Sequence, residues 1–343
     1  MLKTFKTLAF AALPLSIAVT SVQASEEVNI YSYRQQFLIQ PMLDAFTAET
    51  GIKTNVVFAK KGLIERLENE GKNSPADIVL TSDIGPLYDV VSKGLTQPVQ
   101  SDVLEQNIPS QFRDPSDHWF GLTARTRIIY ASKDRVKDGE IASYEDLADP
   151  KWKGRICTRS GKHTYNLSLI GSMIAHQGEE QAQQWLEGLK ANLARKPQGN
   201  DRAQVKAVKE GVCDLALGNS YYFGKMITNE KNPEQKEWAN SVNLLFPNQA
   251  DRGAHMNISG AALTKYAPNK ASAIKLMEFL SEAEAQAMYA EANFEFPVRP
   301  GTKRSALIEQ YMGQFKEDTI NLQQVAELRA DAARMVDKVG FDN

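Results

Sequence analysis

The sequence predicts an α/β protein built from two lobes, and three observations support this prediction. Strand-like and helix-like patterns alternate from residue 28 to residue 81, which is typical of an α/β sandwich. Residues 77–81 form a short, continuously apolar strand of the kind found in parallel sheets. The chain has 343 residues, which is more than one compact hydrophobic core usually serves.

The elements of the first half follow from residue periodicity. An alternating, β-rich segment predicts a strand over 28–33. Apolar residues at helical spacing predict a helix over 41–50, which Gly51 ends. We further expect a strand over 52–59, a helix over 63–70, the apolar strand over 77–81 and a long strand over 120–132. Residues 144–155 are rich in turn formers, so a break is expected there.

The second half continues the alternation. We expect a strand over 156–158, helices over 168–176 and 179–193, a buried strand over 213–217, and strands over 243–246 and 256–263. From Lys270 onward the pattern is mostly helical, with one break over 294–301. The sequence shows no internal repeat and no low-complexity segment, which is consistent with ordinary globular lobes.

Residues 1–24 predict a cleavable secretory signal peptide. Lys3 and Lys6 give a positive start, residues 8–19 are apolar but too short to cross a bilayer, and Ala24 ends a small-residue cleavage pattern. A buried N-terminal helix is the alternative. Because no cysteine lies near the cleavage point, we expect an exported protein without a lipid anchor. The periplasm is its expected compartment, with full secretion as the second choice.

Composition and motifs exclude several classes of function. The 40 basic and 42 acidic residues nearly balance, so the charge does not indicate a nucleic-acid surface. The sequence has no G-x-S-x-G, HExxH, Walker or G-x-G-x-x-G motif, so we do not expect an enzyme. The four histidines are scattered, as ordinary surface or capping residues are.

Cys157 and Cys213 are the two cysteines of the chain. An exported chain meets an oxidising compartment, so a disulfide between them is expected. It would close a loop of 56 residues, which the chain-entropy model values at roughly 4 kcal/mol as an upper figure. Two buried free thiols are the alternative.

Four of the eleven tyrosines lie at strand ends or in loops, which is where α/β sheets bind ligands. Tyr33 ends the first strand, Tyr165 precedes a predicted helix, and Tyr221 and Tyr222 follow a strand. A trivalent hard cation can displace the proton of a phenol, so this pattern favours ferric iron, whereas zinc or manganese would favour His, Cys or carboxylates. From spacing alone, the alternative is that one tyrosine of the adjacent pair lies in the core and the other on the surface.

Three arginines are candidate neighbours of these tyrosines in the folded protein. Arg34, Arg125 and Arg127 are candidates to balance the charge of such a site or to hold a small co-bound anion.

Six segments carry a resemblance to a known family. They are VNIYSYR (28–34), SPADIVLTSD (74–83), ARTR (124–127), DPKWKGR (149–155), GNSYY (218–222) and HMNISG (255–260). In these segments, and in the Tyr221-Tyr222 pair with Tyr165 placed 56 positions earlier, the chain resembles the periplasmic ferric-iron-binding proteins of bacterial ABC iron importers. The similarity covers nearly all of the chain after the signal peptide.

The resemblance implies a type II periplasmic solute-binding fold, in which hinge strands join two α/β lobes that close over iron. It implies that Tyr165, Tyr221 and Tyr222 are iron ligands from the C-terminal lobe. Arg125 takes the place of an arginine near the iron-bound anion or the phenolates, and Arg34 is expected to make a similar contact.

The first-strand loop is expected to supply the ligand of the N-terminal lobe. Many relatives have His or His-Tyr directly after this strand, whereas this chain has Gln35-Gln36. Tyr33 is therefore the expected fourth ligand, and Gln35 or Gln36 is the alternative.

We expect an N-terminal lobe of residues 25–126 plus 253–300 and a C-terminal lobe of residues 127–252 plus 301–343. Each cysteine precedes a predicted ligand by eight residues, so the disulfide is expected to hold the two ligand-bearing segments side by side.

The expected cargo is Fe(3+), with a synergistic anion such as carbonate. The expected partner is an inner-membrane ABC permease with its ATPase, and the protein is expected to be a monomer that binds no nucleic acid. The alternative function is a binding protein for a small organic or oxyanion solute, such as a polyamine, sulfate or phosphonate, with Arg34 and Arg125 as primary ligands.

Overall fold

The computed structural model describes residues 26–343, so the predicted signal peptide lies outside the described residues. The strands are β1 (Glu27–Ser32), β2 (Lys53–Phe58), β3 (Ile78–Thr81), β4 (Phe120–Ser132), β5 (Ile156–Cys157), β6 (Leu215–Asn219), β7 (Val242–Leu245), β8 (Met256–Leu263) and β9 (Phe296–Pro297).

The helices of the first half are α1 (Gln36–Thr50), α2 (Leu63–Glu70), α3 (Ile84–Ser92), α4 (Asp102–Asn107), α5 (Thr164–Gln177) and α6 (Glu179–Ala191). Those of the second half are α7 (Asp201–Lys209), α8 (Tyr221–Ile227), α9 (Glu234–Asn240), α10 (Lys270–Ser281), α11 (Ala283–Asn293), α12 (Ala306–Met312), α13 (Leu322–Glu327) and α14 (Arg329–Val339). Short 3-10 helices occupy Gly71–Asn73, Ser110–Phe112, Glu145–Ala148 and Pro150–Trp152.

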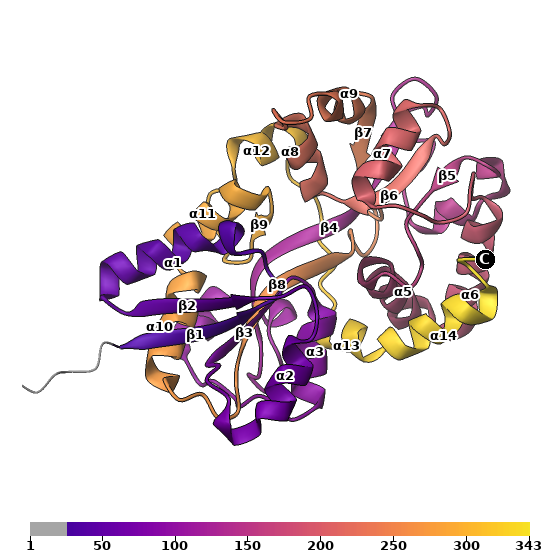
Figure 1. Ribbon diagram of the computed structural model, residues 1–343. Helices are drawn as coiled ribbons and strands as arrows, with labels where there is room; N and C mark the ends of the chain where they lie inside the picture. The colour runs from indigo at the N-terminus through magenta and orange to yellow at the C-terminus, as the bar shows by residue number, and fades with distance from the viewer. Residues whose placement is uncertain (1–25) are drawn as a thin grey trace, which may run out of the picture.

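One long strand, β4, is shared by two groups of strands. The strand order is β2-β1-β3-β8-β4-β6-β5, and β7 and β9 also pair with β4. The partner of β4 changes between two neighbouring residues, since Thr126 pairs with Met256 of β8 and Arg127 pairs with Asn219 of β6. In Figure 1, β4 therefore runs from the body that contains β1–β3 to the body that contains β5–β7. The lobe boundaries themselves stay a prediction.

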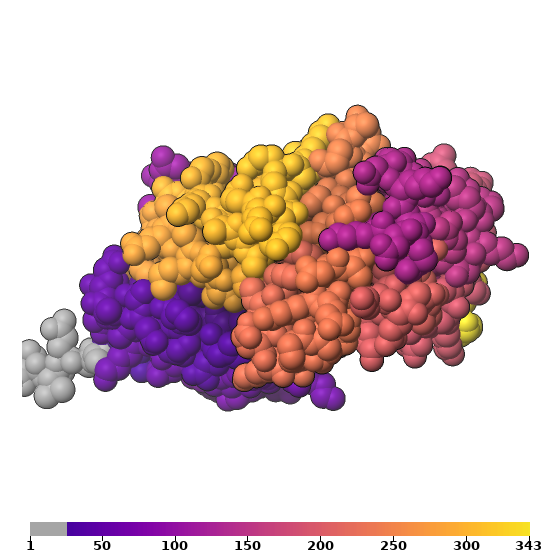
Figure 2. Space-filling model, turned by 90° about the horizontal axis from the view of Figure 1, so that it is seen from above, coloured from indigo at the N-terminus to yellow at the C-terminus, as the bar shows by residue number. Residues whose placement is uncertain are grey.

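The C-terminal segments connect the two bodies. Helix α13 packs against both α3 and α5, and α14 packs against α5 and α6. One hydrophobic cluster of the second body joins residues of α5 and α6 to Met335 and Val336 of α14. Figure 2 shows the indigo N-terminal segment and the magenta middle segment at opposite ends of the molecule, with the orange and yellow segments between them.

Several predicted elements are confirmed. The strands over 120–132 and 256–263 and the helix over 63–70 have the predicted bounds. In β4 and β8 every residue is buried, as expected for strands covered on both faces.

Two helices begin earlier than predicted. Helix α1 begins at Gln36 and contains Pro41, which the prediction used as its first residue. Proline removes one backbone donor, but here it lies close to the helix start, so few helical bonds are affected. Helix α5 begins at Thr164 because the ring of His163 accepts a hydrogen bond from the amide of Tyr165. Histidine is not a usual N-cap residue, so the sequence pattern did not indicate this start.

Five helices, α3, α4, α7, α8 and α9, were not predicted. They have six to nine residues each, which is too short for a clear helical periodicity. Within residues 26–343, no helix is both long enough and apolar enough to cross a membrane.

Candidate metal centre

A cavity of about 400 Å³ lies between the two bodies. Its lining comes from both of them and includes the loop after β1, the middle of β4, and the starts of α5, α7 and α8. The lining residues are Tyr33, Arg34, Gln35, Phe37, Leu38, Ser82, Arg125, Tyr165, Asn200, Arg202, Tyr221, Tyr222, Lys225, Asn293 and Glu295. The predicted site residues Tyr33, Arg34, Arg125, Tyr165, Tyr221 and Tyr222 therefore line one cavity, whereas the further candidate Arg127 does not.

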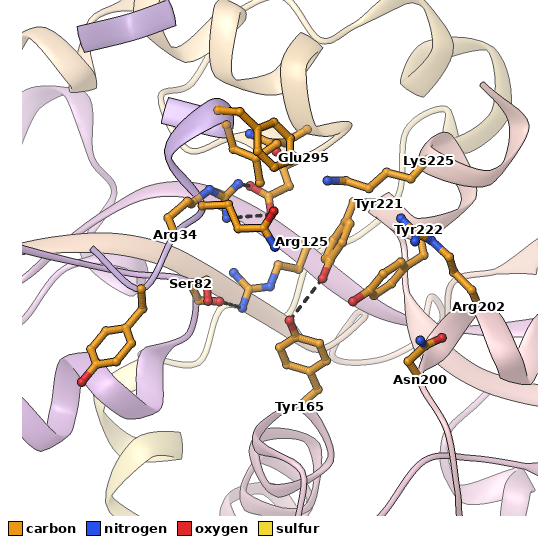
Figure 3. A pocket seen from close by; sticks show the side chains of 15 residues that line it. Arg34, Ser82, Arg125, Tyr165, Asn200, Arg202, Tyr221, Tyr222, Lys225 and Glu295 are labelled. Carbon is orange, nitrogen blue, oxygen red and sulfur yellow. Dashed lines mark hydrogen bonds and ion pairs between the residues drawn. The ribbon is translucent and has the colours of Figure 1, made fainter. Parts of the chain in front are cut away.

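Three of the four predicted tyrosines come together. The hydroxyl oxygens of Tyr165 and Tyr221 are 3.2 Å apart, and the ring centroids of Tyr221 and Tyr222 are 4.3 Å apart. Figure 3 shows that the hydroxyls of all three point toward the same part of the cavity. Tyr165 lies in the first turn of α5 rather than before it, and the adjacent pair begins α8. Three phenol oxygens thus converge on one point.

The chain folds locally so that α8 presents its tyrosines to the cavity. Strand β6 ends at Asn219, and α8 begins two residues later. Gly224 packs against the ring of Phe294, since a Cβ at Gly224 would lie only 2.4 Å from that ring. Phe294 has a left-handed backbone with φ of 56°, which ends α11 and turns the following Glu295 toward the cavity.

Tyr33 lines the cavity but does not join the other three tyrosines. Its hydroxyl accepts a hydrogen bond of 2.9 Å from the amide of Ile64, the second residue of α2. Gln35 also lines the cavity, whereas Gln36 does not. The fourth ligand therefore stays a prediction, and Tyr33 would have to leave the Ile64 amide to reach the cluster.

Arg34 and Arg125 are buried and already bound to protein groups. Arg34 forms an ion pair of 2.5 Å with Glu295 and donates to the hydroxyl of Ser259 at 2.7 Å. Arg125 donates to the same hydroxyl at 3.1 Å and to the carbonyl of Ser82. Burial opposes ionisation of Glu295, but Arg34 and Arg125 keep its pKa below the ordinary value.

Three arginines surround the ring of Tyr165. The guanidinium carbons of Arg125, Arg127 and Arg159 lie 5.7, 6.0 and 5.2 Å from the ring centroid. Arg127 does not line the cavity, because it is bound to Asp201, Asn166 and Asn219 behind the tyrosines. Asp201, which is 0% exposed, also pairs with Arg159 and so holds both arginines in place.

The phenols of the cluster are hard to ionise without a cation. Burial, and then the neighbouring Tyr165 and Tyr222, raise the pKa of Tyr221 well above its ordinary value. Burial and the neighbouring Tyr165 raise the pKa of Tyr222 to about 12. A bound cation must therefore displace phenolic protons at neutral pH. Among the described residues, no group of three His, Cys, Asp or Glu side chains is arranged to hold a metal ion.

Sequence reasoning missed six polar residues of the cavity: Ser82, Asn200, Arg202, Lys225, Asn293 and Glu295. Arg202 and Lys225 lie in α7 and α8, which were not predicted. Lys225 is four residues after Tyr221, so a predicted helix there would have placed both on one face. Burial lowers the pKa of Lys225 to about 8, while the nearby Glu295 opposes that change.

The predicted disulfide is confirmed. Cys157 is bonded to Cys213, and the sequence separation is 56 residues. Cys157 is the last residue of β5, and it pairs with Ala216 in the parallel strand β6. Because α5 follows β5 and α8 follows β6, the bond links the two segments that carry the tyrosines.

Replacement of both cysteines by serine is expected to lower the free energy of unfolding by about 2–4 kcal/mol. The reason is that the unfolded chain loses the restraint on a loop of 56 residues. Denaturant titration of the double variant against the oxidised parent measures this difference. If the tyrosines depend on the bond for their placement, ferric iron affinity also falls, and an unchanged affinity would refute that part of the prediction.

Comparison with known proteins places the chain in a family. Residues 73–321 match the model of the bacterial extracellular solute-binding protein family. Iron uptake protein A1 of Synechocystis is 44% identical over 317 residues, which cover 92% of this chain and 88% of that protein.

Two solved structures have the same fold. The ferric iron-binding protein A of Mannheimia haemolytica, in an open conformation, has a TM-score of 0.89 and 53% identity, covering 93% of this chain and 99% of that one. A Trichodesmium protein in complex with iron and citrate ligands has a TM-score of 0.89 and 43% identity, covering 92% and 99%. The predicted α/β fold with two lobes, the type II solute-binding fold, is thereby confirmed. The chain belongs to the family of bacterial extracellular solute-binding proteins, together with the ferric iron-binding proteins that it resembles.

Proposed function

We propose that this protein binds ferric iron in the cleft between its lobes through tyrosine phenolates. The observation that carries the proposal is the convergence of the hydroxyls of Tyr165, Tyr221 and Tyr222 on one part of the cavity. Three phenolates neutralise a trivalent ion, and hard oxygen donors suit ferric iron. The names of the relatives, an iron uptake protein and a ferric iron-binding protein, support the same cargo.

The arginines are proposed to balance the phenolates. Arg125 is 1% exposed, and its guanidinium carbon lies 5.7 Å from the ring of Tyr165, so its charge acts on the phenolates with little screening by water. Arg34 pairs with Glu295 and also lines the cavity.

Closure of the cleft is proposed to complete the site. Iron first binds to the three tyrosines of the second body, and closure brings the loop after β1 toward it, with Tyr33 as the proposed fourth ligand. Iron stabilises the closed form only by the difference between its affinities for the two forms. A permease distinguishes the loaded protein by this change of shape.

The protein is proposed to act as a monomer in the periplasm. It is proposed to deliver ferric iron to an inner-membrane ABC permease with its ATPase. The protein forms and breaks no bond in its cargo, so the proposal is transport and not catalysis. A synergistic anion such as carbonate is proposed to share the cleft with iron.

Titration of the iron-free protein with ferric iron tests this proposal. Ferric phenolate absorbs visible light, so we expect a coloured complex with one iron per protein. A small organic or oxyanion solute, such as a polyamine, sulfate or phosphonate, is the alternative cargo. Saturable binding of one of these by a protein that gives no colour with iron would favour that alternative.

A further inference from the structure

The carboxylate of Asp83 connects the two bodies. Asp83 follows β3 and caps the start of α3, since its Oδ1 accepts a hydrogen bond of 2.9 Å from the amide of Gly85. The same oxygen accepts a hydrogen bond of 2.7 Å from the hydroxyl of Thr164, the first residue of α5 in the second body. Thr164 directly precedes Tyr165. One carboxylate oxygen therefore caps a helix of the first body and holds the helix turn that carries a tyrosine of the cavity.

Asn257 of β8 makes a second connection to the same turn of α5. Its Nδ2 donates to Oδ2 of Asp83 at 3.1 Å and to the hydroxyl of Ser168 at 3.0 Å. Its Oδ1 accepts a hydrogen bond of 3.2 Å from the amide of Ile84. Thr164 and Ser168 are four residues apart, so they lie on the same face of α5. We call the following four residues the α5 link: Asp83, Asn257, Thr164 and Ser168.

Three members of the α5 link are shielded from water. Asp83, Asn257 and Ser168 are buried, whereas Thr164 is half-buried. Nη2 of Arg125 lies 3.5 Å from Oδ2 of Asp83 and offsets the charge of the carboxylate. Since hydrogen bonds to a charged group are strong where water is excluded, the α5 link resists displacement of the first turn of α5.

The α5 link lies beside the point where β4 changes its partner. Asn257 of β8 pairs with Arg125 of β4, two residues before Arg127 takes β6 as its partner. When one body rotates against the other about such a crossing, the groups next to the crossing move least. The place of the α5 link therefore suits a contact that both bodies keep during rotation.

We propose that the α5 link positions the Tyr165 oxygen for ferric iron, and that Thr164 acts through Tyr165 and not on the ion. The inference rests on the proposed function, because it concerns a ligand of that same site. Within residues 26–343, the Tyr165 hydroxyl has one hydrogen-bond partner, the hydroxyl of Tyr221. The place of the Tyr165 ring therefore depends on the backbone at the start of α5, which Asp83 of the first body holds.

Thr164→Val tests the proposal, because valine keeps the shape of threonine and removes the hydroxyl that donates to Asp83. We expect less phenolate absorption per bound iron at saturation. Loss of a group that supports a metal ligand weakens metal binding about 10–100-fold, so the affinity should fall by at least about tenfold. Thr164→Ser keeps the hydroxyl and should behave like the parent. Thr264→Val is the matched control, since it removes a buried hydroxyl that donates to the carbonyl of Ala76 outside the cavity.

The same substitution in the Tyr165→Phe background separates positioning from a general loss of stability. If Thr164 acts through Tyr165, Thr164→Val causes no further loss of absorption or affinity there. An equal loss in both backgrounds would overturn the proposal, and so would a Thr164→Val protein that matches the parent.

A second variant covers a failure to fold. If circular dichroism shows that Thr164→Val does not fold, Ser168→Ala, which removes the hydroxyl that accepts from Asn257, is compared in the same two backgrounds and judged by the same outcomes. A parent protein that gives no iron colour contradicts the proposed function instead. A coloured parent whose band and affinity survive Thr164→Val contradicts only this inference.

Discussion

Tyr221→Phe is expected to weaken ferric iron binding by more than about 100-fold and to remove much of the visible absorption band. The substitution deletes one of three converging oxygens and leaves the buried ring in place. Loss of a residue that only supports a metal ligand typically weakens metal binding about 10–100-fold, so loss of a ligand should exceed that range. Iron titration with a competing chelator measures the affinity, and the absorption spectrum measures the band.

Tyr165→Phe is expected to behave in the same way, and Tyr266→Phe is the matched control. Tyr266 is 50% exposed and lies outside the cavity, so its variant should bind iron like the parent. Bands of full strength in both Tyr165→Phe and Tyr221→Phe would contradict the assignment. Tyr33→Phe tests the proposed fourth ligand. It is measured separately, since it also removes the acceptor of the hydrogen bond from the Ile64 amide.

The long buried strands were predictable from the sequence because their patterns are local. Residues 120–132 and 256–263 are continuous runs without helix-period polarity, and they form β4 and β8 with those bounds. The sequence could not show that β4 pairs with β8 up to Thr126 and with β6 from Arg127 onward. That division depends on pairing between segments about 90 to 130 residues apart, which no local pattern encodes.

Part of the site could be predicted, because ligands bind near the ends of strands and the strand ends could be predicted from the sequence. Tyr165, Tyr221 and Tyr222 were found because side chains after buried strands meet at one edge of a sheet. The partners of Arg34 and Arg125 were not predictable. Glu295 reaches Arg34 from 261 positions away, through the left-handed turn at Phe294. Lys225 was missed because α8 is short.

Ferric iron affinity is expected to fall by about 1000-fold when the pH is lowered from 7 to 6. In the iron-free protein the pKa of Tyr221 is raised well above its ordinary value and that of Tyr222 is about 12, so the phenols are protonated at pH 7. Binding through three phenolates then releases three protons, and the apparent affinity changes by about a factor of ten per proton and pH unit. The sign follows directly: acid supplies the protons that iron must displace, so acid weakens binding.

Competition with nitrilotriacetate, whose own protonation and iron affinity are known, measures this slope. Two other groups near the tyrosines have shifted pKa values that lie outside this interval: burial and nearby arginines lower the pKa of His163 to about 4, and burial lowers the pKa of Lys225 to about 8. Tyr221→Phe is the sharper control, since a site with one phenol fewer should release one proton fewer. Equal slopes for the parent and this variant would mean that the Tyr221 oxygen keeps its proton in the complex and does not bind iron as a phenolate.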